Sequence, residues 1–291
     1  MIRIVPVHAA VWAGINNCVI DFLYLRFMKR LSLTFVFICC ELFSFAQTEA
    51  IKFKADLLNN KVEYKELIGK ELKSTFISKD FSRLFTHADN SIVYGFIGDN
   101  YLRIRIKLIT VTKDAKSPDV YHVYGKSMVK TNVDEFNGTI TITNIRQLKN
   151  MSYGVDDEYK GKGLKGEYIV LADYSFLENK AQPHSGQFKG VCESDFYLDK
   201  NNKVNYDDID LGSSDRFKNN QFAGQWASYD NRLIQRCNWG DFRIPNSDHF
   251  DIGAGDFSPA GYGGKYLQNG WQTLNDEKIE NAKWWQWPLS D

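Results

Sequence analysis

The chain has 291 residues and carries 36 basic and 36 acidic side chains. That length permits one large domain or two small ones, with a core that needs no metal to hold it together. The neutral balance argues against a general nucleic-acid-binding protein, which would carry a basic excess.

Residues 28–47 have the pattern of a secretory signal peptide. Lys29 and Arg30 precede a short apolar run, and the small residues Ser44 and Ala46 precede an expected cleavage site after Gln47. The run is shorter than the about 20 residues of a membrane span. We therefore expect a periplasmic or secreted protein whose mature chain has no stable membrane span.

Residues 1–27 precede this complete signal, and we interpret them as an over-extended start or a non-structural segment. One alternative is a membrane anchor formed by residues 4–45, although charged residues interrupt that stretch. A lipoprotein is a second alternative, because Cys39 and Cys40 lie inside the signal, but the residues around them do not fit that pattern.

The mature chain retains two cysteines, Cys192 and Cys237. In an oxidising compartment this pair permits one disulfide. The alternative is two buried free thiols, which behave as small apolar side chains.

Residues 48–90 form a mixed, charged N-terminal segment. Within it, residues 62–72 favour a short helix that packs on one end of the following domain, although Gly69 weakens it. From Ile92 the hydrophobic pattern changes to a period of two, which indicates β-strands.

The first strands of the domain are predicted over residues 101–111 and 120–130. In the first, Leu102 and Ile104 share one face while Arg103 and Arg105 share the other. The pair Asn137-Gly138 then favours a tight hairpin turn, with the next strand over residues 139–145.

Further strands are predicted over residues 166–177, 186–197, 203–210 and 222–229, with a turn at residues 199–202. Short strands with turns between them indicate a barrel or a sandwich. We therefore predict one all-β domain over residues 91–291, an antiparallel lipocalin-like barrel, with a β-sandwich as the alternative. An aromatic residue is followed two positions later by glycine at three strand starts, although the spacing is unequal: Phe136 and Gly138, Phe188 and Gly190, Phe222 and Gly224.

The last 66 residues, 226–291, contain six of the seven tryptophans. They also contain two stretches, residues 237–245 and 251–259, that we predict to be ordered, irregular loops. These stretches read CNWGDFRIP and DIGAGDFSP. Together with residues 219–226 and Gly270-Trp271, they resemble an uncharacterised family of exported bacterial all-β proteins. The resemblance implies export and a shared fold, and it carries no catalytic residues.

Tests for metal and cofactor motifs are negative. The residues after Asp199 do not have oxygen ligands and a glycine at the positions that a calcium-binding loop requires. We therefore predict a hairpin turn with solvent-exposed acids there. The four histidines of the mature chain have no metal-ligand spacing, and no phosphate or dinucleotide loop occurs. We therefore expect no metal, no cofactor and no catalytic residue.

One hypothesis is that the C-terminal loops form a small-molecule or glycan site. Their tryptophans could stack on the apolar faces of a ligand, and their charged side chains could bind its polar atoms. Its candidate members are Trp226, Trp239, Asp241, Arg243, Asp251, Asp256 and Trp271. The alternative is that these residues have only a structural role, with the tryptophans in the core and Asp241 paired with Arg243.

The function expected from these features is that of an exported, non-catalytic ligand-binding or envelope-associated protein. One alternative is a secreted glycan hydrolase that uses paired carboxylates. Another is a protein–protein interaction module, with Trp284, Trp285 and Trp287 forming an exposed patch.

Overall fold

The computed structural model describes residues 49–61, 65–212, 214–251, 255, 257–259 and 264–286. All of them belong to one compact unit, Ala46–Asp291. The nine strands are β1 (Val93–Ile97), β2 (Leu102–Lys113), β3 (Val120–Val129), β4 (Asn132–Gln147), β5 (Gly166–Glu178), β6 (Gly186–Leu198), β7 (Val204–Tyr206), β8 (Asn219–Ser228) and β9 (Ile234–Asp241). The labelled helices are α2 (Lys73–Phe76), α3 (Ser82–Phe85) and α4 (Glu277–Glu280), with 3-10 turns η1 (Asn90–Ile92), η2 (Val155–Asp157), η3 (Asp248–Phe250), η5 (Leu267–Asn269) and η6 (Trp284–Gln286).

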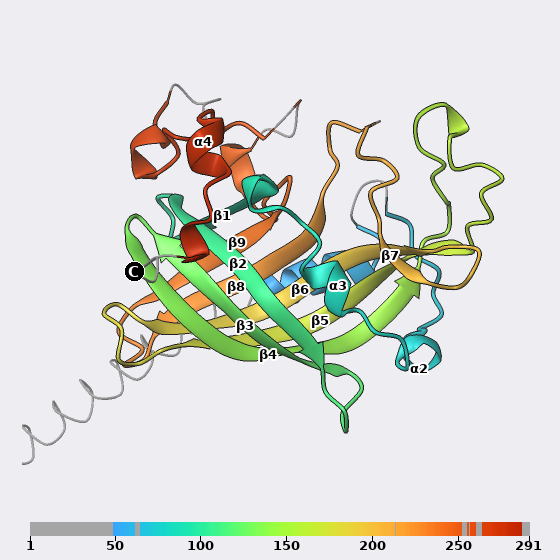
Figure 1. Ribbon diagram of the computed structural model, residues 1–291, viewed down its shortest axis with the longest axis horizontal. Helices are drawn as coiled ribbons and strands as arrows, with labels where there is room; N and C mark the ends of the chain where they lie inside the picture. The colour runs from blue at the N-terminus through green and yellow to red at the C-terminus, as the bar shows by residue number, and fades with distance from the viewer. Residues whose placement is uncertain are drawn as a thin grey trace, which may run out of the picture. The chain divides into compact units, whose positions relative to one another are not determined.

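Eight of these strands form a closed antiparallel barrel (Figure 1). Each strand pairs with the next along the chain, β7 being an extra strand on the edge of β6. Closure comes from β9, which pairs with β8 on one side and with β1 on the other. The predicted antiparallel barrel is thus confirmed, and the sandwich alternative is wrong.

Aromatic rings fill the middle of the barrel, and glycines on neighbouring strands make room for them. Gly125 lies opposite Phe136, and Gly138 opposite Phe176. Gly190 lies opposite Tyr174, whose hydroxyl reaches Gly190 and its partner Gly224. The aromatic–glycine recurrence in the sequence is therefore a packing pattern, in which large and small side chains alternate across the narrow interior.

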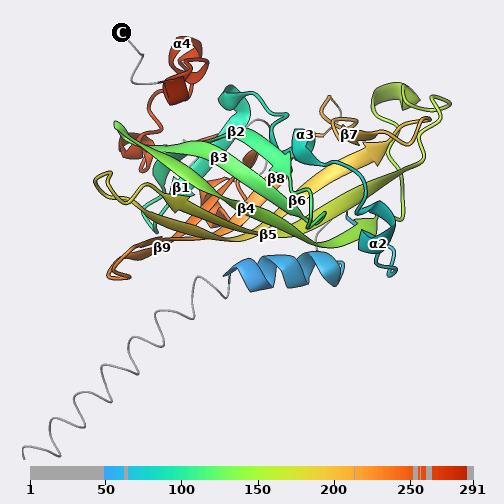
Figure 2. The same ribbon diagram turned by 60° about the horizontal axis from the view of Figure 1, so that its bottom comes forward.

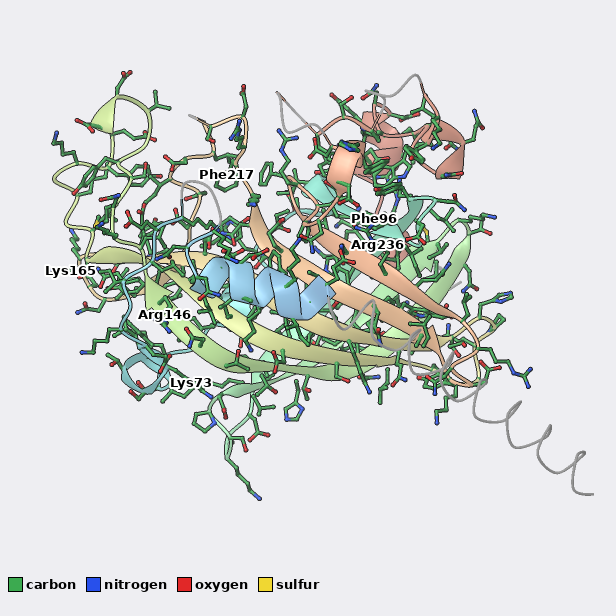
Figure 3. The ribbon with its side chains drawn as sticks, turned by 180° about the vertical axis from the view of Figure 1, so that it is seen from behind. Lys73, Phe96, Arg146, Lys165, Phe217 and Arg236 are labelled. Carbon is green, nitrogen blue, oxygen red and sulfur yellow. The ribbon has the colours of Figure 1, made fainter. Side chains whose placement is uncertain are left out.

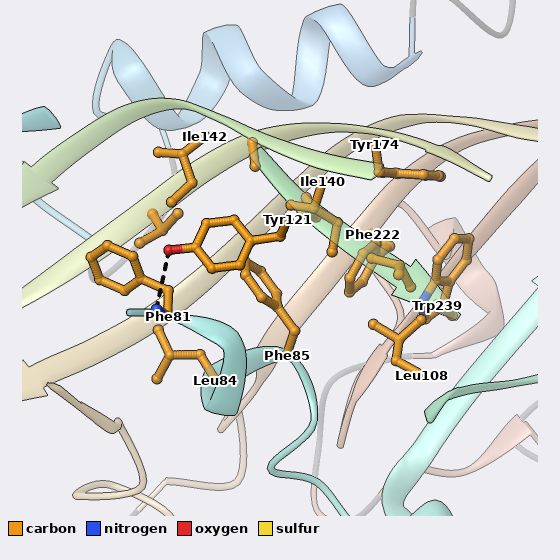
Figure 4. Close-up of a cluster of buried hydrophobic side chains, with 14 of the residues drawn as sticks. Phe81, Leu84, Phe85, Leu108, Tyr121, Ile140, Ile142, Tyr174, Phe222 and Trp239 are labelled. Atoms are coloured by element: carbon orange, nitrogen blue, oxygen red, sulfur yellow. Dashed lines mark hydrogen bonds between the residues drawn. The ribbon is translucent and has the colours of Figure 1, made fainter. Parts of the chain in front are cut away.

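One end of the barrel is plugged by the segment that contains α2 and α3. Phe76 packs at 5.0 Å from the ring of Tyr168, and Phe81 at 5.3 Å from that of Phe196. Figure 4 shows this plug against Tyr121, whose hydroxyl accepts a hydrogen bond from the backbone N–H of Phe81 at 3.2 Å. The residues that pack on this end of the barrel are thus α2 and α3, which follow the segment, residues 62–72, that was predicted to do so.

A helical segment over residues 49–58 lies against the outside of the barrel (Figure 2). Ala50, Phe53 and Leu57 recur at helical spacing and pack against outward-facing residues of β5 and β6, among them Leu171 and Val191. This apolar stripe explains why the outer faces of both strands are buried there.

The C-terminal segment covers another part of the outer surface, over β1. Its core contains Phe96, Phe250 and the fully buried Trp271. Beside it, the guanidinium of Arg236 lies 4.9 Å from the ring centre of Phe96 (Figure 3). Arg236 also pairs with Glu49 at 3.2 Å, which ties the outer helical segment to β9.

Three local predictions are wrong. Residues 65–72 are not helical, because Leu67 instead forms a β-bridge with Leu148. The pair Asn137-Gly138 makes no turn, since β4 runs through it and the hairpin turns at Lys130-Thr131. The first five residues of 237–245 are not loop, because they form the end of β9 that closes the barrel.

Replacing Gly190 by alanine should destabilise the fold, because the added Cβ would lie 2.3 Å from the backbone oxygen of Ala223 and 2.7 Å from Cα of Gly224. We expect a loss of about 2–3 kcal/mol in the free energy of unfolding, typical of overpacking in a rigid core. Urea unfolding measures it. Gly69→Ala is the matched control, since nothing lies within 4 Å of its added Cβ, and an equal loss in both variants would contradict this account.

Candidate functional site

The opposite end of the barrel contains a cavity of about 370 Å³. It lies where β1–β2, β3–β4, β5–β6 and β8–β9 are joined, and all eight barrel strands contribute to its wall. One residue from each strand in chain order is Ile97, Ile104, Ser127, Asp134, Glu178, Phe188, Trp226 and Gln235. We call this space the mouth cavity.

Glu178 is held rigidly in the wall of the mouth cavity. Its Oε1 accepts a hydrogen bond from the Ser127 hydroxyl at 2.5 Å. Its Oε2 accepts from the backbone N–H of Gly186 at 2.8 Å and from the indole N–H of Trp226 at 2.9 Å. All three donors are neutral, so they orient the carboxylate without cancelling its charge.

Asp134 lies in the same wall and is less well satisfied. Its Oδ2 accepts a hydrogen bond from the side-chain amide of Asn132 at 2.5 Å. Its Oδ1 is buried and has no hydrogen-bond partner among the described residues. Burial, and next the charge of Glu178, raise the pKa of Asp134 to about 6. The mouth cavity therefore contains a desolvated acceptor that titrates near neutral pH.

The rest of the wall is mostly apolar, although the basic side chains of Lys130 and His184 also line it. Ile97, Ile104 and Phe188 are buried members of the barrel core, and Leu233 is half-exposed at the rim. The cavity can thus hold an apolar ligand body and still offer two carboxyl groups to a donor or a cation.

Among the predicted site residues, Trp226 belongs to this cavity, while Trp239 lies in the aromatic layer within the barrel, stacked at 4.7 Å on Phe222. Asp241 lies toward the plugged end, where Tyr206 and Asn220 donate to its Oδ2 at 2.9 and 2.7 Å. Burial raises the pKa of Asp241 to about 7. Trp239 and Asp241 share a cavity of only about 30 Å³, about the volume of one water molecule.

Arg243 and Asp251 are partners in an ion pair, at 2.7 Å between Nη1 and Oδ1. Arg243 also donates to the backbone oxygens of Asp215 and Gly255, so it joins three loop segments. The expected pairing of Asp241 with Arg243 is wrong, because each is bound to other groups. Asp256 lies outside the described residues.

Trp271 is a core residue of the C-terminal segment. Its indole N–H donates to the backbone oxygen of Tyr101 at 2.7 Å, and the guanidinium of Arg103 lies 5.0 Å from its ring centre. The residues predicted to form one C-terminal site therefore lie in three separate places: the mouth cavity, the barrel interior and the outer surface.

Cys192 and Cys237 are both free, buried thiols. They belong to β6 and β9, which are separated by β8. Two strand spacings amount to roughly 10 Å, beyond the reach of about 7 Å between disulfide-bonded Cα atoms. The disulfide prediction is therefore corrected to the alternative of two buried thiols.

Asp134 and Glu178 were not predicted as site residues from the sequence. The alternation of each strand could have identified them, because both acids fall on inward-facing positions. Asp134 lies two positions before Phe136, and Glu178 continues the inward series of Tyr174 and Phe176. An acid at an inward position near a strand end indicates a polar wall at a barrel mouth.

A second group of acids lies on the outer face of the barrel. There Lys65 bridges Glu193 at 2.6 Å and Asp195 at 2.5 Å. Burial raises the pKa of Asp195 to about 7 and that of Glu167 to about 8. Since Lys65 already occupies the space between two of these acids, the group fixes the segment before α2 to β6. No metal-binding cluster occurs among the described residues.

Comparison of the chain with protein-family models, with curated proteins and with solved structures returned no match. The resemblance to an exported bacterial family therefore stays a prediction. Within the described parts of the chain, no helix is long and apolar enough to cross a membrane.

Asp134→Asn should stabilise the protein at pH 7.5 and leave it nearly unchanged at pH 4. A raised pKa means that the folded state keeps its proton where the unfolded chain has lost it, so this carboxyl lowers stability as pH rises from about 4 past about 6. We expect a gain of about 1–2 kcal/mol, since one pKa unit corresponds to about 1.4 kcal/mol and water in the cavity screens the charge. Denaturant unfolding at several pH values measures it.

The control is Asp230→Asn in the loop between β8 and β9. A hydrogen bond from the hydroxyl of Ser228 lowers the pKa of Asp230, so its stabilising contribution is present at neutral pH and lost on acidification. The two variants should therefore differ in sign at pH 7.5. The same sign in both would contradict the assignment of a raised pKa to Asp134.

Proposed function

We propose that this protein is a non-catalytic binding protein whose mouth cavity takes a small amphipathic molecule with a cationic or hydrogen-bond-donating group. The observation that carries the proposal is the unpartnered Oδ1 of Asp134, buried in the wall of a cavity beside the fixed carboxylate of Glu178. A volume of about 370 Å³ lies within the usual range for small-molecule sites, about 300–1,000 Å³.

The chemistry of the wall favours a primary amine on an aromatic or aliphatic body. An ammonium group can donate to Oδ1 of Asp134 and neutralise the paired negative charges, an interaction strengthened by the low local dielectric. The apolar body would then contact Ile97, Ile104 and Phe188, where burial of apolar surface contributes about 25 cal/mol per Å².

We further propose that the protein acts after export, in the periplasm or outside the cell. The support is the signal-peptide pattern of residues 28–47. The mass of the protein recovered from its host tests this point, since cleavage after Gln47 leaves a chain that begins at Thr48.

A glycan hydrolase is the second candidate function. Asp134 and Glu178 are neighbouring carboxyl groups in different environments, which is the arrangement by which glycosidases separate an acid from a nucleophile or base. The three hydrogen bonds to Glu178 favour binding instead, because they engage both oxygens of the group that would have to attack. Turnover of an aryl glycoside that disappears in Glu178→Gln would support the hydrolase.

The interaction-module alternative has less support. Trp284 is buried and donates its indole N–H to Asn90 at 2.8 Å, and Lys107 lies 5.1 Å from the ring centre of Trp285. These two tryptophans hold the C-terminal segment to the barrel, and Trp287 lies outside the described residues.

Phenethylamine should bind the protein, and methyl phenethyl ether, which has the same ring but neither a charge nor a hydrogen-bond donor, should bind at least tenfold more weakly. Asp134→Asn should weaken phenethylamine binding about tenfold or more, since a hydrogen bond to a charged group contributes about 1.5–3 kcal/mol. The affinity should also fall as pH drops below about 6, because Asp134 then takes up a proton. Isothermal titration calorimetry measures all three effects.

The matched control is Asp230→Asn, which removes a carboxylate near the same end of the barrel without touching the mouth cavity. Equal affinity for the two probes, or unchanged binding of phenethylamine in Asp134→Asn, would overturn the proposed role of the mouth cavity.

A further inference from the structure

A second cavity, of about 510 Å³, lies on the outer surface of the barrel. The start of β2 and the end of β3 form its floor, and the C-terminal segment with α4 and η6 forms its wall. Arg103, Arg105 and Lys130 line it, and among the described residues no carboxylate does. We call it the basic cavity.

The two arginines at the basic cavity are buried and share a single carboxylate. Glu280 accepts from Arg103 Nη2 at 2.5 Å and from Arg103 Nη1 at 2.9 Å. It also accepts from Arg105 Nη2 at 2.8 Å. Two guanidinium charges are thus balanced by one negative charge, and exposed Lys130 at the rim adds a third cation.

Arg105 has unused donor capacity. Both Nη atoms of Arg103 bond to Glu280, and its Nη1 also lies 3.3 Å from the Thr273 hydroxyl. Within the described part of the chain, Arg105 makes one side-chain hydrogen bond, although a guanidinium carries five N–H donors. Burial, followed by the charge of Arg103, lowers the pKa of Arg105, as expected for a cation that lacks full compensation.

We propose that the basic cavity binds an organic anion, a carboxylate or phosphate monoester attached to an apolar body, with Arg105 as its principal contact. A planar guanidinium matches the oxygens of both anions in a bidentate geometry. Met128, Ile279 and Trp284 supply the apolar part of the wall. The anion completes the charge balance that Glu280 leaves unfinished.

This site is separate from the mouth cavity, although the two share Leu102, Lys130 and Thr131 in their walls. Arg105 lines only the basic cavity, and Asp134 lines only the mouth cavity. The substitution that disables one site therefore serves as a control for the other, and the two proposals can fail independently.

The test is isothermal titration calorimetry of the full chain with 1-naphthyl phosphate, 1-naphthoate and the uncharged analogue 1-naphthol. At least one anion should bind tenfold or more tightly than 1-naphthol. Arg105→Gln should weaken that binding at least tenfold. Asp134→Asn, and Lys116→Gln in the distant β2–β3 turn, should leave the affinity within twofold.

Ala282→Phe provides a variant that breaks no ion pair. Ala282 is exposed and lines the basic cavity, so a phenyl ring there fills the space while Arg103, Arg105 and Glu280 stay paired. We expect anion binding to be lost in this variant even if Arg105→Gln fails to fold. Failure of both anions to bind the unchanged protein, or binding unaffected by Ala282→Phe, would overturn the proposal.

Discussion

Pairing of β9 with β1 closes the sheet, and closure limits the interior of an eight-stranded barrel to roughly the width that side chains fill. The rings of Phe136, Phe176, Phe188 and Trp239 pack against one another across that width, with glycines opposite two of them on the neighbouring strands. The cavity that Trp239 lines there has a volume of only about 30 Å³, too small for a ligand much larger than a water molecule. One end is plugged by α2 and α3, which leaves the other end as the position where inward-facing side chains border an internal hollow.

The buried polar groups that border the cavities differ in how many hydrogen bonds they make. Asp241, toward the plugged end, receives two hydrogen bonds, and Glu178 at the mouth receives three. In contrast, Oδ1 of Asp134 is buried at the mouth cavity and has no partner among the described residues, and Arg105 makes a single side-chain hydrogen bond at the basic cavity. Burying an unpaired polar atom costs about 1–3 kcal/mol, so atoms left this way beside open space indicate binding more strongly than paired ones do.

The sequence predicts the strands well because alternation is a local signal, visible in residues 101–111 without knowledge of the partner strand. It fails where the deciding contact is distant. Asn137-Gly138 resembles a turn, but Gly138 is needed opposite Phe176, 38 positions further along the chain. Residues 237–241 resemble a loop because their strand character depends on pairing with β1, which precedes them by about 140 positions.

The site could be predicted only in part, for a related reason. The tryptophans near the C-terminus suggested a ligand surface. However, Trp239 is buried in the barrel core, and Trp271 is buried in the apolar cluster between the C-terminal segment and β1. Only Trp226 borders the mouth. The two acids of the cavity wall stand in ordinary strand sequences. Neither Asp134 nor Glu178 is distinctive until β4 pairs with β5, which places Phe136 opposite Glu178 and brings both acids to the same rim.

The hairpin between β3 and β4 connects the two cavities physically. Lys130 and Thr131 line both, with the acidic mouth on one side and the arginines on the other. If each cavity binds the ligand proposed for it, an anion in the basic cavity would attract the ammonium group of Lys130, reduce the positive charge at the mouth and so favour a cation there. Because coupling free energy between two sites is reciprocal, a cation in the mouth must strengthen anion binding by the same factor. The shared hairpin thus predicts positive coupling between ligands of opposite charge in the two cavities.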